Sequence, residues 1–509
     1  MVLCAPRCIL RSSPLRRYVV SRRQRSTLKT PNQTRFSYYL SSNDKPQEII
    51  GKLHGNAVLE NPKKHNAAVV LATPELAKQL DDHNFNSELV SLLSASESIK
   101  DFHLLCAIVD NIAPALGEPV PMPGISVLRG DLDSLLPKLW APGQPGQPDQ
   151  PDPPVEKFER DSVAALTFKV GLSTQTLPLT RTTFLNNKAS TLLTSRYDLS
   201  QGTPKLKQTS EKQWQNVHVE IDQPAQSVAD FGLWAPLSPV TRARKLTESF
   251  GNIVRGIEAG GKPIPASAEL EDAVNSMFAH QRTAATTSGP MGVWALITPD
   301  NSQTSSWSAE NAPDPSAILQ GKAVTRADVE SCAYYLEQQH QVGSRFYQVL
   351  SGGGGWGLKK GLLSLDPRET FFASSEEEEM EKFMRTMSNS SFAPPGAHIQ
   401  FFVPAMASAE TVATSATGVV FGVPLTPEST REYDSSKKGY LVADHFGALS
   451  TQGIYLSVRP DPGADTYHDS KLSVPGSRIY IGNAGTKTGG IFGFLGGGDL
   501  ADAGMIAMM

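Results

Sequence analysis

Cysteine and long apolar runs are both scarce in this sequence. Only four cysteines occur in 509 residues, which excludes a disulfide-stabilised scaffold for a chain of this length. No uninterrupted apolar run reaches the roughly 18 residues that a spanning helix needs, so no transmembrane segment is predicted. Aromatic residues make up only 7% of the chain, yet several apolar periodic segments occur, and these exclude wholesale disorder.

Acidic residues are absent from the first 43 positions, since the first one is Asp44. The same segment holds eight arginines and Lys29 and is rich in serine and threonine. This composition is typical of a transit peptide, which an inside-negative membrane potential draws into mitochondria. We therefore predict a mitochondrial transit peptide over residues 1–43 and a location in the mitochondrial matrix. Arg35–Ser37 is one predicted processing site and Arg17–Ser21 a competing one, while a disordered basic tail is the alternative.

Loss of this segment would leave an acidic protein. The remaining chain has 38 basic and 51 acidic residues, a net charge of −13. Sequence-independent binding to nucleic acid depends on neutralising phosphates with lysine and arginine, so the charge disfavours nucleic acid as a partner. Two cysteines remain, Cys106 in an apolar run and Cys332 on a predicted helix face. Both are predicted to be buried, reduced thiols.

The first folded block is predicted over residues 45–140. Ala67–Ala72 and Leu104–Val109 are continuous apolar runs, and Thr73 is the predicted N-cap of a helix between them, with Pro74 in its first turn. Two apolar strands separated by a helix predict a parallel βαβ unit. The predicted fold class is therefore α/β, or mixed α+β, with a βαβ-type N-terminal block followed by a larger region of sheets and helices.

The middle of the chain is predicted to begin with a linker and continue as a mixed block. Residues 141–156 are rich in proline and are expected to form a semi-rigid linker or an exposed loop. The block 157–350 is predicted to start with strands at Ala165–Val170 and Val217–Ile221, where apolar and polar residues alternate. Three helices are then predicted: one with the apolar stripe Leu246, Phe250, Ile253, Val254 and Ile257, one with Leu270, Val274, Met277 and Phe278 after an N-cap at Ser267, and one that a capping box of Thr325 and Asp328 opens.

The C-terminal part is predicted to return to strands. A β-rich block is expected over residues 351–488, and the Gly-rich residues 489–509 are expected to form a flexible tail. An acidic stretch at Glu376–Glu381 is predicted to be a solvated helix. The expected strands are Ile399–Val403, Gly418–Val423, Gly453–Ser457 and Arg478–Ile481.

A run of four glycines is the most unusual feature of the sequence. Backbone N–H groups of such a run can converge on an anion, and two lysines that follow closely can complete the site. The run is expected to follow the end of a helix, whereas a phosphate site usually precedes a helix, and its spacing matches neither common nucleotide-binding motif. The alternative is a helix stop with a tryptophan packed as a plug. The predicted ligand-binding residues are Gly352, Gly353, Gly354, Gly355, Trp356, Lys359 and Lys360.

Motifs for metal binding or catalysis are not apparent. There is no H-E-x-x-H and no C-x-x-C pattern, so no metal site is predicted, and no cofactor is assigned. Gly482–Gly490 is similar to a P-loop, but Thr486 stands where that motif has a glycine and no apolar helix follows. His445 and His468 each neighbour an aspartate, which suits a general base, although an ordinary exposed histidine is the alternative.

The first block resembles a known family. The stretch Ala68–Leu76, together with Ile125–Leu128, resembles FIST-type sensory domains over about a quarter of the chain. The resemblance implies an α/β module that binds small molecules such as amino acids. The chain lacks the Gly-Cys-Thr-Gly-Glu-like turn of that family, so the resemblance assigns no contact residues.

Three hypotheses for the function follow. The leading one is a soluble, multi-domain protein of the mitochondrial matrix without catalysis of its own, which binds a small ligand or acts in assembly with a matrix protein. The second is a matrix enzyme that holds a phosphorylated or acyl substrate at residues 352–360, with His445 or His468 as base. The third is a factor associated with the mitochondrial ribosome or with RNA, which the acidic charge disfavours.

Overall fold

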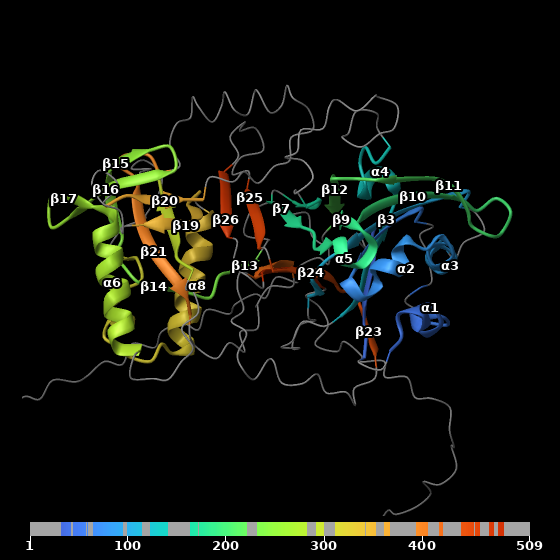
Figure 1. Ribbon diagram of the computed structural model, residues 1–509, viewed down its shortest axis with the longest axis horizontal. Helices are drawn as coiled ribbons and strands as arrows, with labels where there is room; N and C mark the ends of the chain where they lie inside the picture. The colour runs from blue at the N-terminus through green and yellow to red at the C-terminus, as the bar shows by residue number, and fades with distance from the viewer. Residues whose placement is uncertain are drawn as a thin grey trace, which may run out of the picture.

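The structure is a computed structural model with a mixed α/β fold (Figure 1). Strands predominate, arranged in several sheets around a shared core. None of the described helices is long and apolar enough to cross a membrane. The residues that the structure describes are 32–41, 44–56, 59, 65–94, 99–113, 123–140, 163–171, 173–220, 232–281, 292–299, 311–341, 343–352, 361–366, 393–405, 417–420, 439–451, 453–458, 468–472 and 477–482.

The predicted βαβ unit is present in the first block. Strand β2 (Ala67–Ala72) pairs in parallel with β3 (Asp101–Ile108), and α2 (Ala77–Asp81) and α3 (His83–Ser94) lie between them in sequence. All six side chains of β2 are buried, because both faces of this strand are covered.

A seven-stranded sheet, which we call the first sheet, surrounds this unit. Val70 packs into a core with α1 and α3, whereas Val69 packs on the opposite face with residues of a second sheet. The first sheet therefore lies between a layer of helices and a further layer of strands. Its strands, in order, are β11 (Lys205–Glu211), β10 (Leu192–Asp198), β3, β2, β5 (Gly124–Gly130), β1 (Thr34–Tyr39) and β23 (Tyr440–Ala443).

Strand β1 lies within residues 1–43, the segment predicted to be a transit peptide, whose cleavage stays a prediction. β1 pairs with β5 on one side and with β23 on the other, and Phe36 and Tyr39 are fully buried. Loss of residues 1–43 would remove all of β1, and a cut at Arg35–Ser37 would remove part of it, leaving β5 and β23 without the strand between them. A leader compatible with this fold therefore ends before Asn32.

Two five-stranded sheets cover the other face of the first sheet and contribute to the same core. Their C-terminal strands show that the predicted block 351–488 is not one spatial unit, because β22 to β27 join sheets begun by earlier parts of the chain. The second sheet comprises β12 (Trp214–Val219), β6 (Ala165–Val170), β7 (Ser173–Pro178), β25 (Ile454–Val458) and β26 (His468–Leu472), and the third sheet β13 (Gly232–Trp234), β22 (Thr417–Val420), β27 (Ser477–Ile481), β24 (Phe446–Ser450) and β4 (Asn111–Ile112).

A closed six-stranded barrel forms the lobe at the left of Figure 1. It closes because β21 pairs with both β15 and β18. Helix α6 (Ala266–Gln281) packs against it, and α8 (Arg326–Gln341) joins its lobe to the shared core through Cys332 and Leu336. The barrel strands, in order, are β21 (His398–Pro404), β15 (Arg244–Phe250), β16 (Ile253–Ala259), β20 (Leu363–Leu365), β19 (Arg345–Gly352) and β18 (Trp294–Thr298).

The helix predicted from Leu246 to Ile257 is wrong. The segment forms the hairpin β15–β16, in which Leu246 pairs with Ile257 and the chain turns at Gly251, whose φ is +56°. A positive φ favours glycine and ends any helical pattern. Phe250, placed on the buried stripe by the helical spacing, is 84% exposed at the tip of the hairpin.

The other two predicted helices are confirmed. Leu270 and Met277 of α6 are buried, although the helix begins at Ala266, so Ser267 lies inside it rather than at its cap. The capping box at the start of α8 is also present: the Asp328 N–H donates to Thr325 Oγ1 at 3.2 Å, and the Thr325 N–H donates to Asp328 Oδ2 at 2.9 Å.

Cys106 and Cys332 are buried and free, as predicted. The linker 141–156, the acidic stretch Glu376–Glu381 and the tail 489–509 lie outside the described residues. The remaining short elements are η1 (Pro46–Glu48), α1 (Ile49–Leu53), η3 (Pro74–Leu76), α4 (Leu132–Leu135), β8 (Arg181–Thr182), α5 (Thr183–Asn186), β9 (Lys188–Ser190), β14 (Leu237–Pro239), β17 (Lys262–Pro265) and α7 (Ser316–Leu319).

Candidate functional site

The Gly-rich segment connects two strands of the barrel. β19 ends at Gly352, which pairs with Leu363 of the antiparallel β20. The segment therefore follows a strand and not, as expected, the end of a helix, since α8 ends earlier at Gln341. Of the predicted ligand-binding residues, Gly353, Gly354, Gly355, Trp356, Lys359 and Lys360 lie outside the described residues, so their ligand role stays a prediction.

Gly361 marks the end of this connection beside helix α6. Its φ of +91° favours glycine, and a Cβ atom there would lie 2.7 Å from Cβ of Pro265. The Gly361 carbonyl accepts a hydrogen bond from the Ser267 N–H at 3.4 Å. Gly361 is therefore required by close packing at the start of α6, independently of any ligand.

His445, one of the two predicted bases, lies in the interior. Its Nδ1 is 2.8 Å from the hydroxyl oxygen of Ser37, which is in turn 2.8 Å from that of Ser126. Ser37 and Ser126 are fully buried, and His445 is only 5% exposed. These groups join β1, β5 and the start of β24, which is a structural arrangement rather than an open reaction site. His468 begins β26 in the second sheet.

Sequence reasoning missed a short helical turn, α5, that projects from the surface between β8 and β9. Phe184 is 101% exposed and Leu185 36% exposed, although a large apolar side chain normally gains free energy from burial. Asn187 follows in the left-handed conformation, with a φ of +62°, and ends the turn. The sequence pattern of this block predicts strands followed by helices and does not indicate so short a helical element. The one local feature that could have indicated it is the adjacent pair of apolar residues in a polar stretch.

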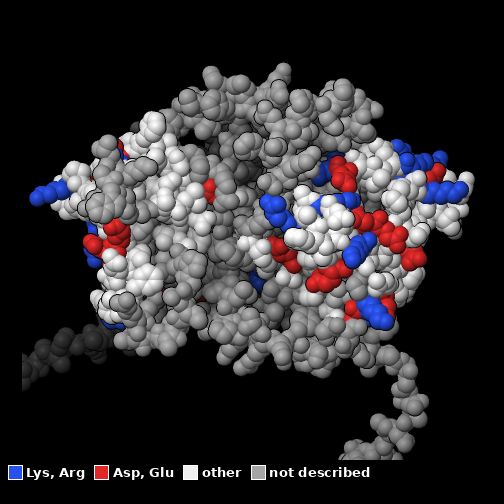
Figure 2. Space-filling model, viewed as in Figure 1, with Lys and Arg blue, Asp and Glu red and all other residues white. Residues whose placement is uncertain are grey.

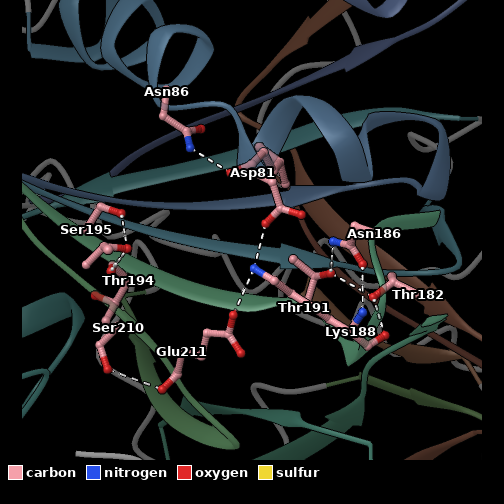
Figure 3. Close-up of polar contacts among 12 residues, drawn as sticks. Asp81, Asn86, Thr182, Asn186, Lys188, Thr191, Thr194, Ser195, Ser210 and Glu211 are labelled. Atoms are coloured by element: carbon pink, nitrogen blue, oxygen red, sulfur yellow. Dashed lines mark hydrogen bonds and ion pairs between the residues drawn. The ribbon is translucent and has the colours of Figure 1, made fainter. Parts of the chain in front are cut away.

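A hydrogen-bond network holds this projecting turn in place (Figure 3). Thr182 and Thr191, both fully buried, share a hydrogen bond of 2.8 Å between their hydroxyl groups. Asn186 donates from Nδ2 to the hydroxyl of Thr191 at 2.9 Å, and Thr182 donates to the carbonyl of Lys188 at 3.2 Å. Residues before, within and after the turn are thereby fixed to one another.

Lys188 then fixes the turn to helix α2 and to strand β11 of the first sheet (Figure 3). Its ammonium group lies 2.7 Å from Asp81 of α2 and 2.9 Å from Glu211 of β11. Burial would lower the pKa of Lys188, but the hydrogen bonds and charges of the two carboxylates outweigh it and raise the pKa. Lys188 therefore stays charged and bridges two elements distant in sequence.

The exposed turn Thr183–Asn186 and the network that holds it suit binding to a partner rather than catalysis. An exposed aromatic residue on a turn that is already ordered loses little conformational entropy when it docks into a partner. Among the described residues, no three His, Cys, Asp or Glu side chains gather where a metal ion could bind. No family model, no curated protein and no solved structure matches this chain.

Proposed function

We propose that this protein is a non-catalytic assembly or accessory factor of the mitochondrial matrix, and that it contacts a partner protein through the turn Thr183–Asn186. The observation that carries the proposal is the complete exposure of Phe184 on a turn held by buried hydrogen bonds. Large aromatic side chains dominate the binding energy of many protein interfaces. The matrix location rests on the arginine-rich leader, and ligand binding by the first block rests on its resemblance to FIST-type domains.

Charge supports a protein partner over a nucleic acid. Figure 2 shows basic and acidic side chains interspersed on the visible face of the lobe that carries α2, α3 and β11. Lys188, a basic residue two positions after the turn, is already paired with two carboxylates. An interface of this kind is expected to gain affinity from apolar burial, since removing a phenylalanine side chain from water contributes about 1.5–3 kcal/mol.

The test is affinity purification of the tagged, processed protein from mitochondria, with quantitative comparison of Phe184→Ser and the parent. The barrel provides a matched control, because Phe250 is also an exposed aromatic residue, at 84%. We expect Phe184→Ser to lose a stoichiometric matrix protein that Phe250→Ser retains.

Two results would contradict the proposal. One is equal recovery of partners by Phe184→Ser and the parent. The other is migration of the endogenous protein as a monomer in matrix extracts at low salt, because an assembly factor should be found in a complex there. If the protein migrates as a homodimer, its partner is a second copy of the chain and not a different matrix protein. That result also contradicts this proposal.

A further inference from the structure

Strand β11 lies at one end of the first sheet and pairs there with β10 alone among the described strands (Figure 1). Six of its seven residues are exposed and Ser210 is partly buried, whereas every residue of β2 in the middle of the same sheet is buried. Because alternate residues of a strand point to opposite faces, exposure along the whole strand means that neither face of β11 is covered.

The register of the sheet shows which backbone groups of β11 face outward. The Lys212 N–H donates to the Leu192 carbonyl at 2.9 Å and continues the ladder between β10 and β11. In an antiparallel pair, residues that bond the neighbouring strand alternate with residues that direct their N–H and C=O away from it. Ser210 therefore bonds β10, whereas Thr209 and Glu211 direct their backbone groups to the open side. Such an edge is a template for one more strand.

The turn with Phe184 lies beside one end of this edge. Glu211 is the last residue of β11, and its carboxylate lies 2.9 Å from the ammonium group of Lys188, which follows the turn by two positions. The edge itself is roughly 20 Å long. A standard interface covers roughly 800 Å² on each partner, which is enough to include both the turn and the edge.

The charges along β11 indicate which kind of strand the edge accepts. Lys207 is paired with Asp101 at 3.0 Å and with Asp198 at 3.2 Å. The ammonium group of Lys205 donates instead to the neutral side-chain oxygen of Gln201, and no carboxylate of the described residues pairs with it. Figure 2 shows basic side chains at the end of the lobe where β10 and β11 join. Residues of opposite charge stabilise neighbouring strands, so an added strand with an acidic residue beside Lys205 is favoured.

A second copy of the chain matches this edge less well than an acidic segment does. The one carboxylate of β11 is that of Glu211, which is already bound to Lys188. Antiparallel pairing of two copies of β11 would offer Lys205 this occupied carboxylate, and parallel pairing would place lysines beside lysines, which is unfavourable. The chemistry of the edge thus favours a different protein.

We propose that the partner of the turn Thr183–Asn186 adds an extended acidic segment to β11, which bonds the backbone of Thr209 and Glu211 and places a carboxylate beside Lys205. In such an arrangement the main-chain hydrogen bonds supply affinity and the side chains supply specificity. The inference rests on the proposed function, because it assigns the edge to the protein that covers Phe184. It adds that this protein carries an acidic segment able to form a strand.

The variant Thr209→Pro tests the edge directly. Proline has no N–H group and is tolerated on an edge strand where its nitrogen faces solvent, so the variant removes an outward donor and leaves the ladder with β10 in place. Thr209→Ala is the matched control, because it loses the same hydroxyl, which donates to the Thr194 carbonyl at 3.3 Å, but retains the N–H group. At equal thermal midpoints, we expect Thr209→Pro to bind the partner purified from mitochondria at least about tenfold more weakly than Thr209→Ala.

Two measurements on the unaltered complex do not depend on the folding of a variant. Amide hydrogen exchange at Thr209 and Glu211 should slow at least about tenfold when the partner is bound, because an added strand bonds these N–H groups. A zero-length carbodiimide joins an amine to a carboxylate that touches it, and it should couple Lys205 to an aspartate or glutamate of the partner.

The outcomes separate this inference from the proposed function. Loss of the partner in Phe184→Ser with retention in folded Thr209→Pro would overturn the added strand and leave the proposed function standing. Loss in Thr209→Pro with retention in Phe184→Ser would support the added strand and contradict the contact at the turn. Unchanged exchange of both amides in the complex, or coupling of Lys205 to a second copy of the chain, would also overturn the added strand, and absence of any partner would overturn both.

Discussion

The hydroxyl oxygen of Ser37 lies 2.8 Å from Nδ1 of His445, although 408 positions separate the two residues in the sequence. Ser126 extends the contact, since its hydroxyl lies 2.8 Å from that of Ser37 and accepts the Gly447 N–H at 3.0 Å. Three strands of two different sheets therefore meet at one buried polar group. Strand β24, which comes late in the chain, is held to β1 and β5 by this contact.

Ser37→Ala should destabilise the protein. Removing the hydroxyl leaves buried partners without their hydrogen bond, which costs about 1–3 kcal/mol, and we expect this loss in the free energy of unfolding measured by urea denaturation. Ser91→Ala is a suitable control, because Ser91 is exposed on α3 and bonds only within its own helix, to the Ser87 carbonyl at 3.1 Å. Unchanged stability of Ser37→Ala, or labelling of Ser37 by a fluorophosphonate that reacts with nucleophilic serines, would contradict a structural role.

Because of His103, the free energy of unfolding should depend on pH in the acidic range. Burial lowers the pKa of His103 to about 4, and its Nδ1 accepts a hydrogen bond from the Trp140 indole at 2.9 Å, which requires a neutral ring. An unfolded histidine has a pKa of about 6.5, so the unfolded chain binds more protons between these values. The stabilisation is complete above pH 6.5 and is lost as the pH falls towards 4, by up to about 3 kcal/mol.

The variant His103→Asn separates this contribution from other acid effects. The side-chain oxygen of asparagine can replace Nδ1 as the acceptor but does not titrate, so the loss of stability between pH 6.5 and 4 should become shallower. The exposed His54 provides the control variant His54→Asn, in which the parent slope should persist. Identical slopes of unfolding free energy against pH in His103→Asn and the parent would show that His103 is not the titrating group.

Local signals in the sequence predicted local structure well. The apolar run Ala67–Ala72 identifies β2, because a strand covered on both faces needs no polar residues, and Thr325 with Asp328 identifies the start of α8. The stripe from Leu246 to Ile257 failed because its apolar spacing fits a helix by chance, while Gly251 and the residues around it favour a turn. The structure of this segment is determined by pairing between the two strands of a hairpin, and not by the spacing of apolar residues along a single segment.

The candidate sites depend on long-range register, which one sequence does not reveal. His445, predicted as a base, contacts Ser37 only because β1 and the start of β24 meet in the interior, although 408 positions separate the two residues. The turn with Phe184 is held by Lys188 through Asp81, a residue of a helix more than a hundred positions earlier. Residue types alone could mark an anion site at glycines and lysines, but could not mark a turn that is held in place by residues from distant parts of the chain.

The position of β1 predicts where the mature protein begins. Phe36 and Tyr39 are fully buried between β5 and β23, and Ser37 takes part in the buried group with His445. Deleting residues 1–31 should therefore leave the fold intact, whereas deleting residues 1–43 should remove the strand between β5 and β23, expose two sheet edges and abolish cooperative unfolding.

N-terminal sequencing of the protein from mitochondria checks this in the cell. A first residue before Asn32, as cleavage near Arg17–Ser21 would give, fits the structure, and residues 1–31 fused to a fluorescent protein should carry it into the matrix. A mature chain beginning after Arg35 would contradict the fold, because it would lack the residues of β1 that pair with Leu128 and Arg129. Cytosolic retention of the fusion would instead contradict the import role of the leader while leaving the structural boundary standing, so the two parts of the prediction can fail separately.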